Sequence, residues 1–209
     1  MQRELAAYLM QNLAGIAGFS RFGGLVQTLH TNERGTEAVA PVRYPITFDV
    51  FPLPFPYVAP TSYTEFVPNT AEAGIMYLEH VALTAAGYQG NRMELTSTLR
   101  LVCWLQQSHQ DASRLGILAT AQTNILRRLQ PLSLIHNDGI LTRLRVTPGK
   151  FITSDEGLFS RYTYREDIRQ YLLDPYAAFG LDIISTFSVS LACLPEEVDA
   201  KMSFDESFN

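Results

Sequence analysis

The clearest pattern in this chain is an alternation of apolar and polar residues within residues 74–105, GIMYLEHVALTAAGYQGNRMELTSTLRLVCWL. In the second half of this segment the apolar set is Met93, Leu95, Leu99, Leu101, Cys103 and Leu105, and the polar set is Glu94, Thr96, Thr98 and Arg100. A period of two places one side of a strand on a core and the other in water. Gly87, Gly90 and Asn91 tolerate positive φ, so we expect the chain to reverse there, through a loop longer than two residues. The pattern predicts a long β-hairpin.

Apolar residues spaced by three and four positions predict helices that can pack on one face of a sheet. The first set is Leu5, Tyr8, Leu9, Asn12, Leu13 and Ile16, and this helix ends at Gly15 or Gly18. The second set is Leu115, Leu118, Gln122, Ile125, Leu126 and Leu129; Asp111 or Ser113 caps that helix and Pro131 ends it. Residues 164–173 form a third predicted helix, because Thr163 and Glu166 make a capping box ahead of it.

Four further segments have the composition or alternation of strands. Residues 25–31 follow a break at Gly23 and Gly24, and residues 42–50 contain Pro45, which suggests an edge strand or a bulge. Residues 140–146 precede a turn at Pro148 and Gly149. The closing strand has one apolar side made of Phe179, Leu181, Ile183, Phe187, Val189, Leu191 and Cys193. We expect the principal core to contain Leu99, Leu101, Leu181, Ile183 and Phe187.

These elements predict the α+β class, a mostly antiparallel sheet with a long central hairpin and helices packed on it. At 209 residues the chain is long enough for one domain with a sizeable core. We assign residues 1–195 to a single domain. Residues 196–209 are acidic and polar and form a C-terminal tail, in which Phe204 and Phe208 are candidate anchors for a partner.

A proline-rich excursion, residues 51–63 with the sequence FPLPFPYVAPTSY, separates the second strand from the hairpin. Four prolines exclude a helix or a central strand there and favour an extended conformation. An exposed row of Phe51, Phe55 and Tyr57 would form an adhesive surface. Two hypotheses stay open, an arm that binds a neighbouring subunit and a long loop packed on its own domain.

The charge distribution narrows the choice of partner. The net charge is −5, which argues against a protein that binds nucleic acid with its whole surface. Eleven of the sixteen basic residues lie between Arg92 and Arg169, and all but Lys150 are arginine. A solvated or salt-bridged face is the simplest interpretation of such a cluster, and a binding surface is the alternative.

No catalytic, cofactor or metal pattern emerges from the residue types. The four histidines, His30, His80, His109 and His136, lie on separate predicted elements without metal-pair spacing. Cys103 and Cys193 occupy apolar phases of strands and are interpreted as buried thiols. Glu79 and His80 are neighbours on one strand and therefore point to opposite faces. We expect no cofactor, no membrane span and no enzymatic activity.

The order of elements resembles that of bacteriophage tail-terminator and tail-completion proteins, small α+β proteins that form a ring at the head-proximal end of a tail. The resemblance lies in a helix, MQRELAAYLMQNLAG, then a strand pair, GLVQTLHT and VRYPITFDV, then a long hairpin, a helix and a closing strand. The resemblance covers most of the chain. It concerns the order of the elements, and no diagnostic sequence motif of the family is matched. The proline-rich excursion and residues 132–173 exceed the compact pattern of that family, so a neck, connector or other ring protein of the virion also fits.

The resemblance implies a structural role in a virion assembled in the host cytoplasm, where one face of a homo-oligomeric ring binds the tail tube or neck. Arg143 and Arg145 lie on the outward phase of one strand, and Arg165 and Arg169 lie on the third predicted helix. We expect this basic surface to meet an acidic one, on another virion protein or on the tail of the adjacent copy; DNA in the lumen ranks below these. The competing hypothesis is an intracellular, monomeric α+β domain that binds a ligand or acts as an enzyme.

Overall fold

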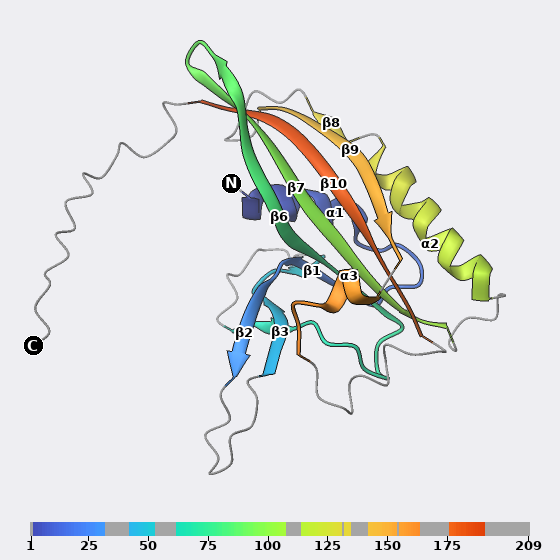
Figure 1. Cartoon of the computed structure of the whole chain (residues 1–209). Helices are drawn as coiled ribbons and strands as arrows, with labels where there is room; N and C mark the ends of the chain where they lie inside the picture. Colours follow the sequence, from blue (N-terminus) through green and yellow to red (C-terminus); the bar gives the residue numbers. More distant parts are fainter. Residues whose placement is uncertain are drawn as a thin grey trace, which may run out of the picture.

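The structure, a computed structural model, describes residues 2–31, 42–52, 62–107, 114–130, 132–134, 142–153, 155–163 and 176–190 (Figure 1). Its helices are α1 (Gln2–Leu13), α2 (Arg114–Leu129) and α3 (Asp155–Phe159). The first strands are β1 (Arg21–Leu25), β2 (Gln27–Thr31), β3 (Val42–Thr47), β4 (Val50–Phe51) and β5 (Thr64–Glu65). The later strands are β6 (Gly74–Gln89), β7 (Arg92–Gln106), β8 (Ser133–Leu134), β9 (Thr142–Ile152) and β10 (Tyr176–Ser190).

The strands form two sheets. The larger has seven strands in the order β4-β1-β6-β7-β10-β9-β8, and the smaller has three in the order β2-β3-β5. Every pairing is antiparallel except that of β1 with β6. The predicted α+β class with a mostly antiparallel sheet is therefore confirmed.

The long hairpin of β6 and β7 is the centre of the larger sheet, as predicted. Its register runs from Gly74 opposite Leu105 to Gln89 opposite Arg92. The reversal is Gly90 and Asn91 alone, with Gly90 at φ 59°, so the expectation of a longer loop is wrong. Gly87 instead lies within β6, beside a shift in register between Ala85 and Gly87.

The helices α1 and α2 pack on one side of the larger sheet, which we call the helix face. Alternate residues of β7 and β10 supply the sheet side of this core, including the five predicted residues Leu99, Leu101, Leu181, Ile183 and Phe187, all buried. From α1 come Leu5, Ala6, Leu9, Met10 and Leu13, and from α2 come Ile117, Ala121, Ile125 and Leu129. The two predicted amphipathic helices are confirmed in type and position.

The opposite side of the sheet, the open face, is covered over only part of its length by the described residues. At the end of the hairpin where β6 begins, α3 and the three-stranded sheet pack on it (Figure 1). The buried residues of this second cluster are Phe66, Ile75, Tyr77, Val102, Trp104, Leu158, Phe159 and Tyr162. Towards the turn the open face presents Thr96, Thr98, Arg100, Asp182, Ile184 and Thr186, all at least partly exposed.

Three expectations about glycine and proline are wrong. Gly23 and Gly24 lie within β1 and do not break the chain. Glycine is needed at position 23 because the Phe66 ring packs there, and a Cβ would lie 2.6 Å from that ring. Pro45 lies in the middle strand of the small sheet, where its carbonyl accepts a hydrogen bond from the Phe66 amide. That position is tolerated because β5 pairs with β3 over two residues only.

The third concerns Pro148 and Gly149, which were expected to turn the chain. Strand β9 continues through them to Ile152, and Pro148 pairs with Ile183. A bulge opposite Asp182 accommodates Gly149, where a Cβ would lie 2.8 Å from the Asp182 carbonyl oxygen. The helix expected over residues 164–173 and the tail at 196–209 lie outside the described residues, and α3 was not predicted.

Candidate assembly surface

Of the nine residues predicted to bind partners, three are described and one of these is wrongly placed. Phe51 belongs to β4 and is 4% exposed within the helix-face core, so the expectation of an exposed Phe51 is wrong. It pairs with Phe22 of β1, which pulls the start of the proline-rich segment into the sheet. The other six lie outside the described residues: Phe55, Tyr57, Arg165, Arg169, Phe204 and Phe208.

Arg143 and Arg145 are both exposed on β9, while Leu144 and Val146 between them are buried in the helix-face core. Lys150 adds a third exposed basic residue on the same strand. We call Arg143, Arg145 and Lys150 the basic strand. Within the described residues none of the three forms an ion pair, in contrast to Arg100, whose guanidinium binds Asp182 at 2.8 Å. Among the described residues, therefore, no carboxylate neutralises the basic strand.

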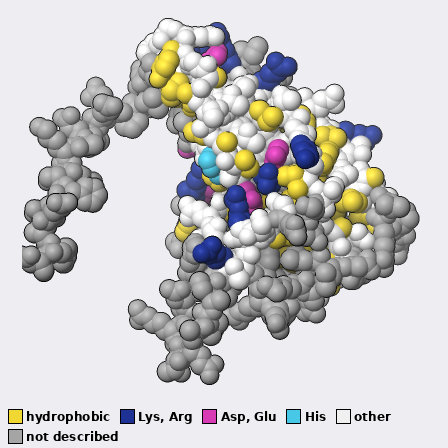
Figure 2. All heavy atoms as spheres, viewed as in Figure 1, with side chains coloured by type: hydrophobic (Ala, Val, Ile, Leu, Met, Phe, Trp, Pro, Cys, Tyr) yellow, Lys and Arg dark blue, Asp and Glu magenta, His cyan; other side chains and the backbone are white. Residues whose placement is uncertain are grey.

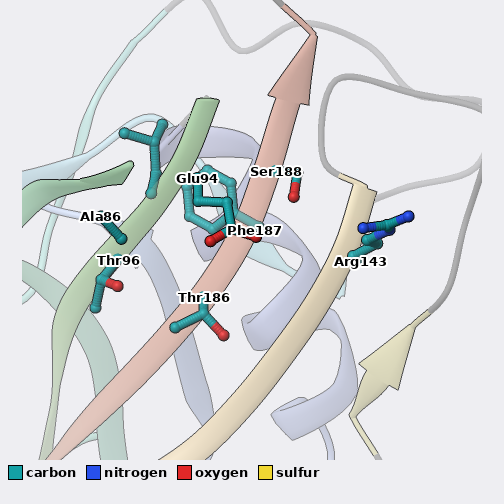
Figure 3. Close-up of a pocket in the computed structure, with 8 residues that line it drawn as sticks. Ala86, Glu94, Thr96, Arg143, Thr186, Phe187 and Ser188 are labelled. Carbon is teal, nitrogen blue, oxygen red and sulfur yellow. The ribbon is translucent and has the colours of Figure 1, made fainter. Parts of the chain in front are cut away.

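A shallow pocket of about 260 Å³ lies between the strands near the hairpin turn (Figure 3). Glu94 and Thr96 come from β7, Thr186 and Ser188 from β10, and Arg143 from β9. Arg143 has a positive φ of 56°, close to the point where the register of β9 and β10 shifts. The pocket holds one carboxylate and one guanidinium, on different strands.

Apolar side chains are exposed on the distal half of β6. Val81, Leu83 and Tyr88 are exposed, Tyr88 to 70%, and hydrophobic side chains gather at this end of the molecule (Figure 2). Both sides of the strand are accessible there, since the described residues from His80 to Asn91 are exposed or half-buried. Exposed apolar patches of this kind mark interaction sites in soluble proteins.

A buried acidic residue, Glu79, links the sheet to the segment that contains α3. The residue is 1% exposed, and its carboxylate accepts a hydrogen bond from the Tyr162 hydroxyl at 2.5 Å. Arg161 lies 3.4 Å from the other carboxylate oxygen. This cluster was not predicted from the sequence, where its one signal is the position of Glu79 on the inward phase of an apolar run.

Burial raises the pKa of Glu79 above its ordinary value, because desolvation penalises the carboxylate more than the Tyr162 hydrogen bond and the Arg161 and Arg100 charges favour it. A perturbed carboxylate beside a tyrosine and an arginine is a common feature of active sites. Here the carboxylate is buried, and its contacts with Tyr162 and Arg161 hold the α3 segment on the sheet.

We predict that replacing Glu79 with glutamine changes the pH dependence of stability. A carboxyl group with a raised folded pKa contributes its full stability below its ordinary pKa and loses it as the pH rises through the folded value. Relative to the wild type, Glu79→Gln should therefore gain unfolding free energy as the pH rises from the ordinary carboxyl pKa of 4.5 to the raised folded pKa, by at most about 1.4 kcal/mol per pH unit. Urea denaturation at several pH values measures this, and a difference that moves in the opposite direction would contradict it.

Metal-ligating residues, the described cysteine and similarity to known proteins indicate no further site among the described residues. Among the described residues no three potential metal-ligating side chains gather, and none of the described helices has the length and apolar character needed to cross a membrane. Cys103 is buried, which raises the pKa of its thiol well above the ordinary value. No protein-family model matches the sequence, and no curated protein matches it.

Proposed function

We propose that this chain is a structural subunit of a bacteriophage virion, a ring-forming tail terminator or a head–tail neck or connector protein. The observation that carries the assembly role is the distal half of β6, which presents Val81, Leu83 and Tyr88 to solvent on a strand that other elements leave uncovered within the described residues. Large apolar side chains grouped at one end of a molecule favour burial against a partner.

The phage assignment rests on the order of elements. A helix, early strands, a long hairpin, a helix and a closing strand follow one another in the chain, the order on which the resemblance to tail terminators is based. In such a role the mechanism is assembly: one face of the ring binds the tail tube or neck, and polymerisation stops there. The partners are further copies of this chain and other virion tail or neck proteins.

The basic strand supports a second, electrostatic contact. Electrostatic complementarity guides docking without exposing further apolar surface, which suits a subunit that must stay soluble before assembly. We propose that the basic strand meets an acidic surface on another virion protein or the acidic tail of an adjacent copy, with DNA in the lumen as a lower-ranked partner.

The competing function is a monomeric ligand-binding or enzymatic domain, and the buried Glu79 cluster is the feature that would favour it. Size-exclusion chromatography with light scattering on the purified protein separates the two proposals. A discrete ring, or an oligomer that grows with concentration, supports the assembly role. A monomer at every concentration supports the alternative.

Charge reversal tests the electrostatic contact. We expect Arg143→Glu with Arg145→Glu to reduce both the yield of assembly and its sensitivity to salt, since fewer screened charge pairs form across the contact. The circular dichroism of the monomer should not change, because both side chains are exposed. Arg127→Glu with Arg128→Glu on α2 is the matched control, with the same change in net charge at two other exposed arginines. Unchanged yield and salt dependence in the β9 variant would remove the basic strand from the interface.

A further inference from the structure

The distal half of β6 has a backbone edge that no described strand occupies. Strand β1 accompanies β6 only as far as Leu78, where Leu25 is its register partner and the Val26 amide donates to the Leu78 carbonyl at 2.8 Å. Beyond Leu78 the strand continues to Gln89 and pairs with β7 on its other side (Figure 1). Its outer amide and carbonyl groups are therefore a template for another strand.

This edge lacks two of the features that protect sheet edges, charged residues and prolines, and its two register shifts lie on either side of residues 82–85. Residues 81–91, VALTAAGYQGN, include neither a charged residue nor a proline. On the far side of the same sheet, β9 contains Pro148 and the three residues of the basic strand. Strand β8 pairs with part of β9 and so covers part of its edge. Charged side chains and prolines disfavour edge-to-edge pairing, so among the described residues of this sheet the distal half of β6 is more open to pairing than β9.

The register shows which residues direct their backbone groups outward. The backbone carbonyl of Leu78 points to β1, so Leu78 and its partner Leu101 form a pair without mutual hydrogen bonds. The amide and carbonyl of Leu101 therefore point away from β6, towards β10. The pairing of β7 with β10 has no register shift, and backbone direction alternates along a strand. The amide and carbonyl groups of Ser97 and Leu95 therefore point towards β10, like those of Leu101. Their partners on β6 are Leu83 and Ala85, which therefore present their amide and carbonyl groups to the free edge.

We propose that the β6 edge of one copy pairs antiparallel with the β6 edge of a second copy, centred on Thr84. In that register Leu83 of one copy lies opposite Ala85 of the other, so the outward backbone groups of both meet. Both side chains belong to the helix face, and their pairing extends one apolar stripe across the two copies. With no charge in residues 81–91, self-pairing brings no like charges together.

The occupant is a second copy because the segment is complementary to itself. A two-fold contact uses the same patch on both partners and closes at two copies. Head-to-tail pairing with β9 would instead place a second strand against the basic strand and Pro148, which disfavour it. The inference goes beyond the proposed virion role and does not depend on it; a larger assembly needs a second contact, for which the basic strand is available.

A cysteine at the two-fold axis tests the register. Directly opposed residues in a pair without mutual hydrogen bonds have Cα atoms about 4.5 Å apart, close enough for a disulfide. We expect Thr84→Cys, in a Cys193→Ser background, to form a covalent dimer on mild oxidation. Cys103 is buried and does not compete. The matched control is Thr186→Cys, an exposed threonine in the same cross-strand row but on the interior strand β10.

A charge on the edge tests the pairing independently of cross-linking. Leu83 and Ile184 have nearly equal exposure, 39% and 37%, but Ile184 lies on β10, between two paired strands. We expect Leu83→Lys to weaken dimerisation at least tenfold by light scattering, and Ile184→Lys to leave it unchanged.

The inference would be overturned by a wild-type monomer at every concentration, by equal cross-linking at Thr84→Cys and Thr186→Cys, or by a dimer that Leu83→Lys does not weaken. Particles larger than a dimer that persist in Leu83→Lys, with no cross-link at Thr84→Cys, also overturn the β6 pairing. That last outcome leaves the proposed assembly role standing, so the two proposals fail separately.

Discussion

Replacing Leu101 or Phe187 with alanine is expected to lower the free energy of unfolding by about 2–5 kcal/mol. Leu101 lies on β7 and Phe187 on β10, and both are buried in the helix-face core beneath the helices. Each truncation removes apolar contacts and leaves a cavity that neighbouring strands, fixed by their ladders, cannot close. Urea denaturation followed by circular dichroism measures the loss.

Thr186→Ala is the control for this pair, because Thr186 adjoins Phe187 in the chain but is exposed on the open face. Its unfolding free energy should stay within about 0.5 kcal/mol of the wild type. If Leu101→Ala and Phe187→Ala were as stable as Thr186→Ala, the assignment of these strands to the core would be wrong.

Trp104→Ala is expected to destabilise the protein by about 3–5 kcal/mol. Trp104 is buried in the second cluster, on the open face, where it stacks on Tyr176 with ring centroids 5.2 Å apart. It also lies among residues of α3, so its loss should loosen that helix from the sheet as well as lower global stability. Trp104→Phe keeps most of the apolar volume and should lose less.

Limited proteolysis separates the local effect from the global one. We expect cleavage within α3 to appear in Trp104→Ala at denaturant concentrations where the wild type and Trp104→Phe resist it. Equal stability and equal cleavage in all three proteins would show that the second cluster does not hold α3 on the sheet.

The elements with a clean period were predictable from the sequence. The alternation in β7 and β10 identified both strands and the residues on their helix face, because only one side of each strand is consistently apolar. The helix patterns of α1 and α2 were equally readable, since their buried residues recur at three and four positions. These elements depend on local pattern, which a single sequence contains.

Features set by distant contacts could not be predicted in the same way. Gly23 resembles a chain break until the Phe66 ring is placed against it, and Pro148 resembles a turn until its pairing with Ile183 is known. Phe51 belongs to a proline-rich run, yet its pairing with Phe22 buries it. In each case the deciding partner lies far away in the chain.

The candidate surface was predictable only in part. In β9, apolar Leu144 and Val146 alternate with Arg143 and Arg145. This pattern predicts buried leucine and valine and exposed arginines, as the structure has them. The free edge of β6 was not predictable, since it depends on where β1 stops, which is opposite Leu78 of β6. An edge is a property of sheet order, and sheet order is fixed by contacts between distant segments.

Electron microscopy of the purified protein tests the assembly role most directly. We expect closed rings with a central opening, in a population that increases with protein concentration. Fields of small particles of monomer size, at concentrations where light scattering also reports a monomer, would contradict it.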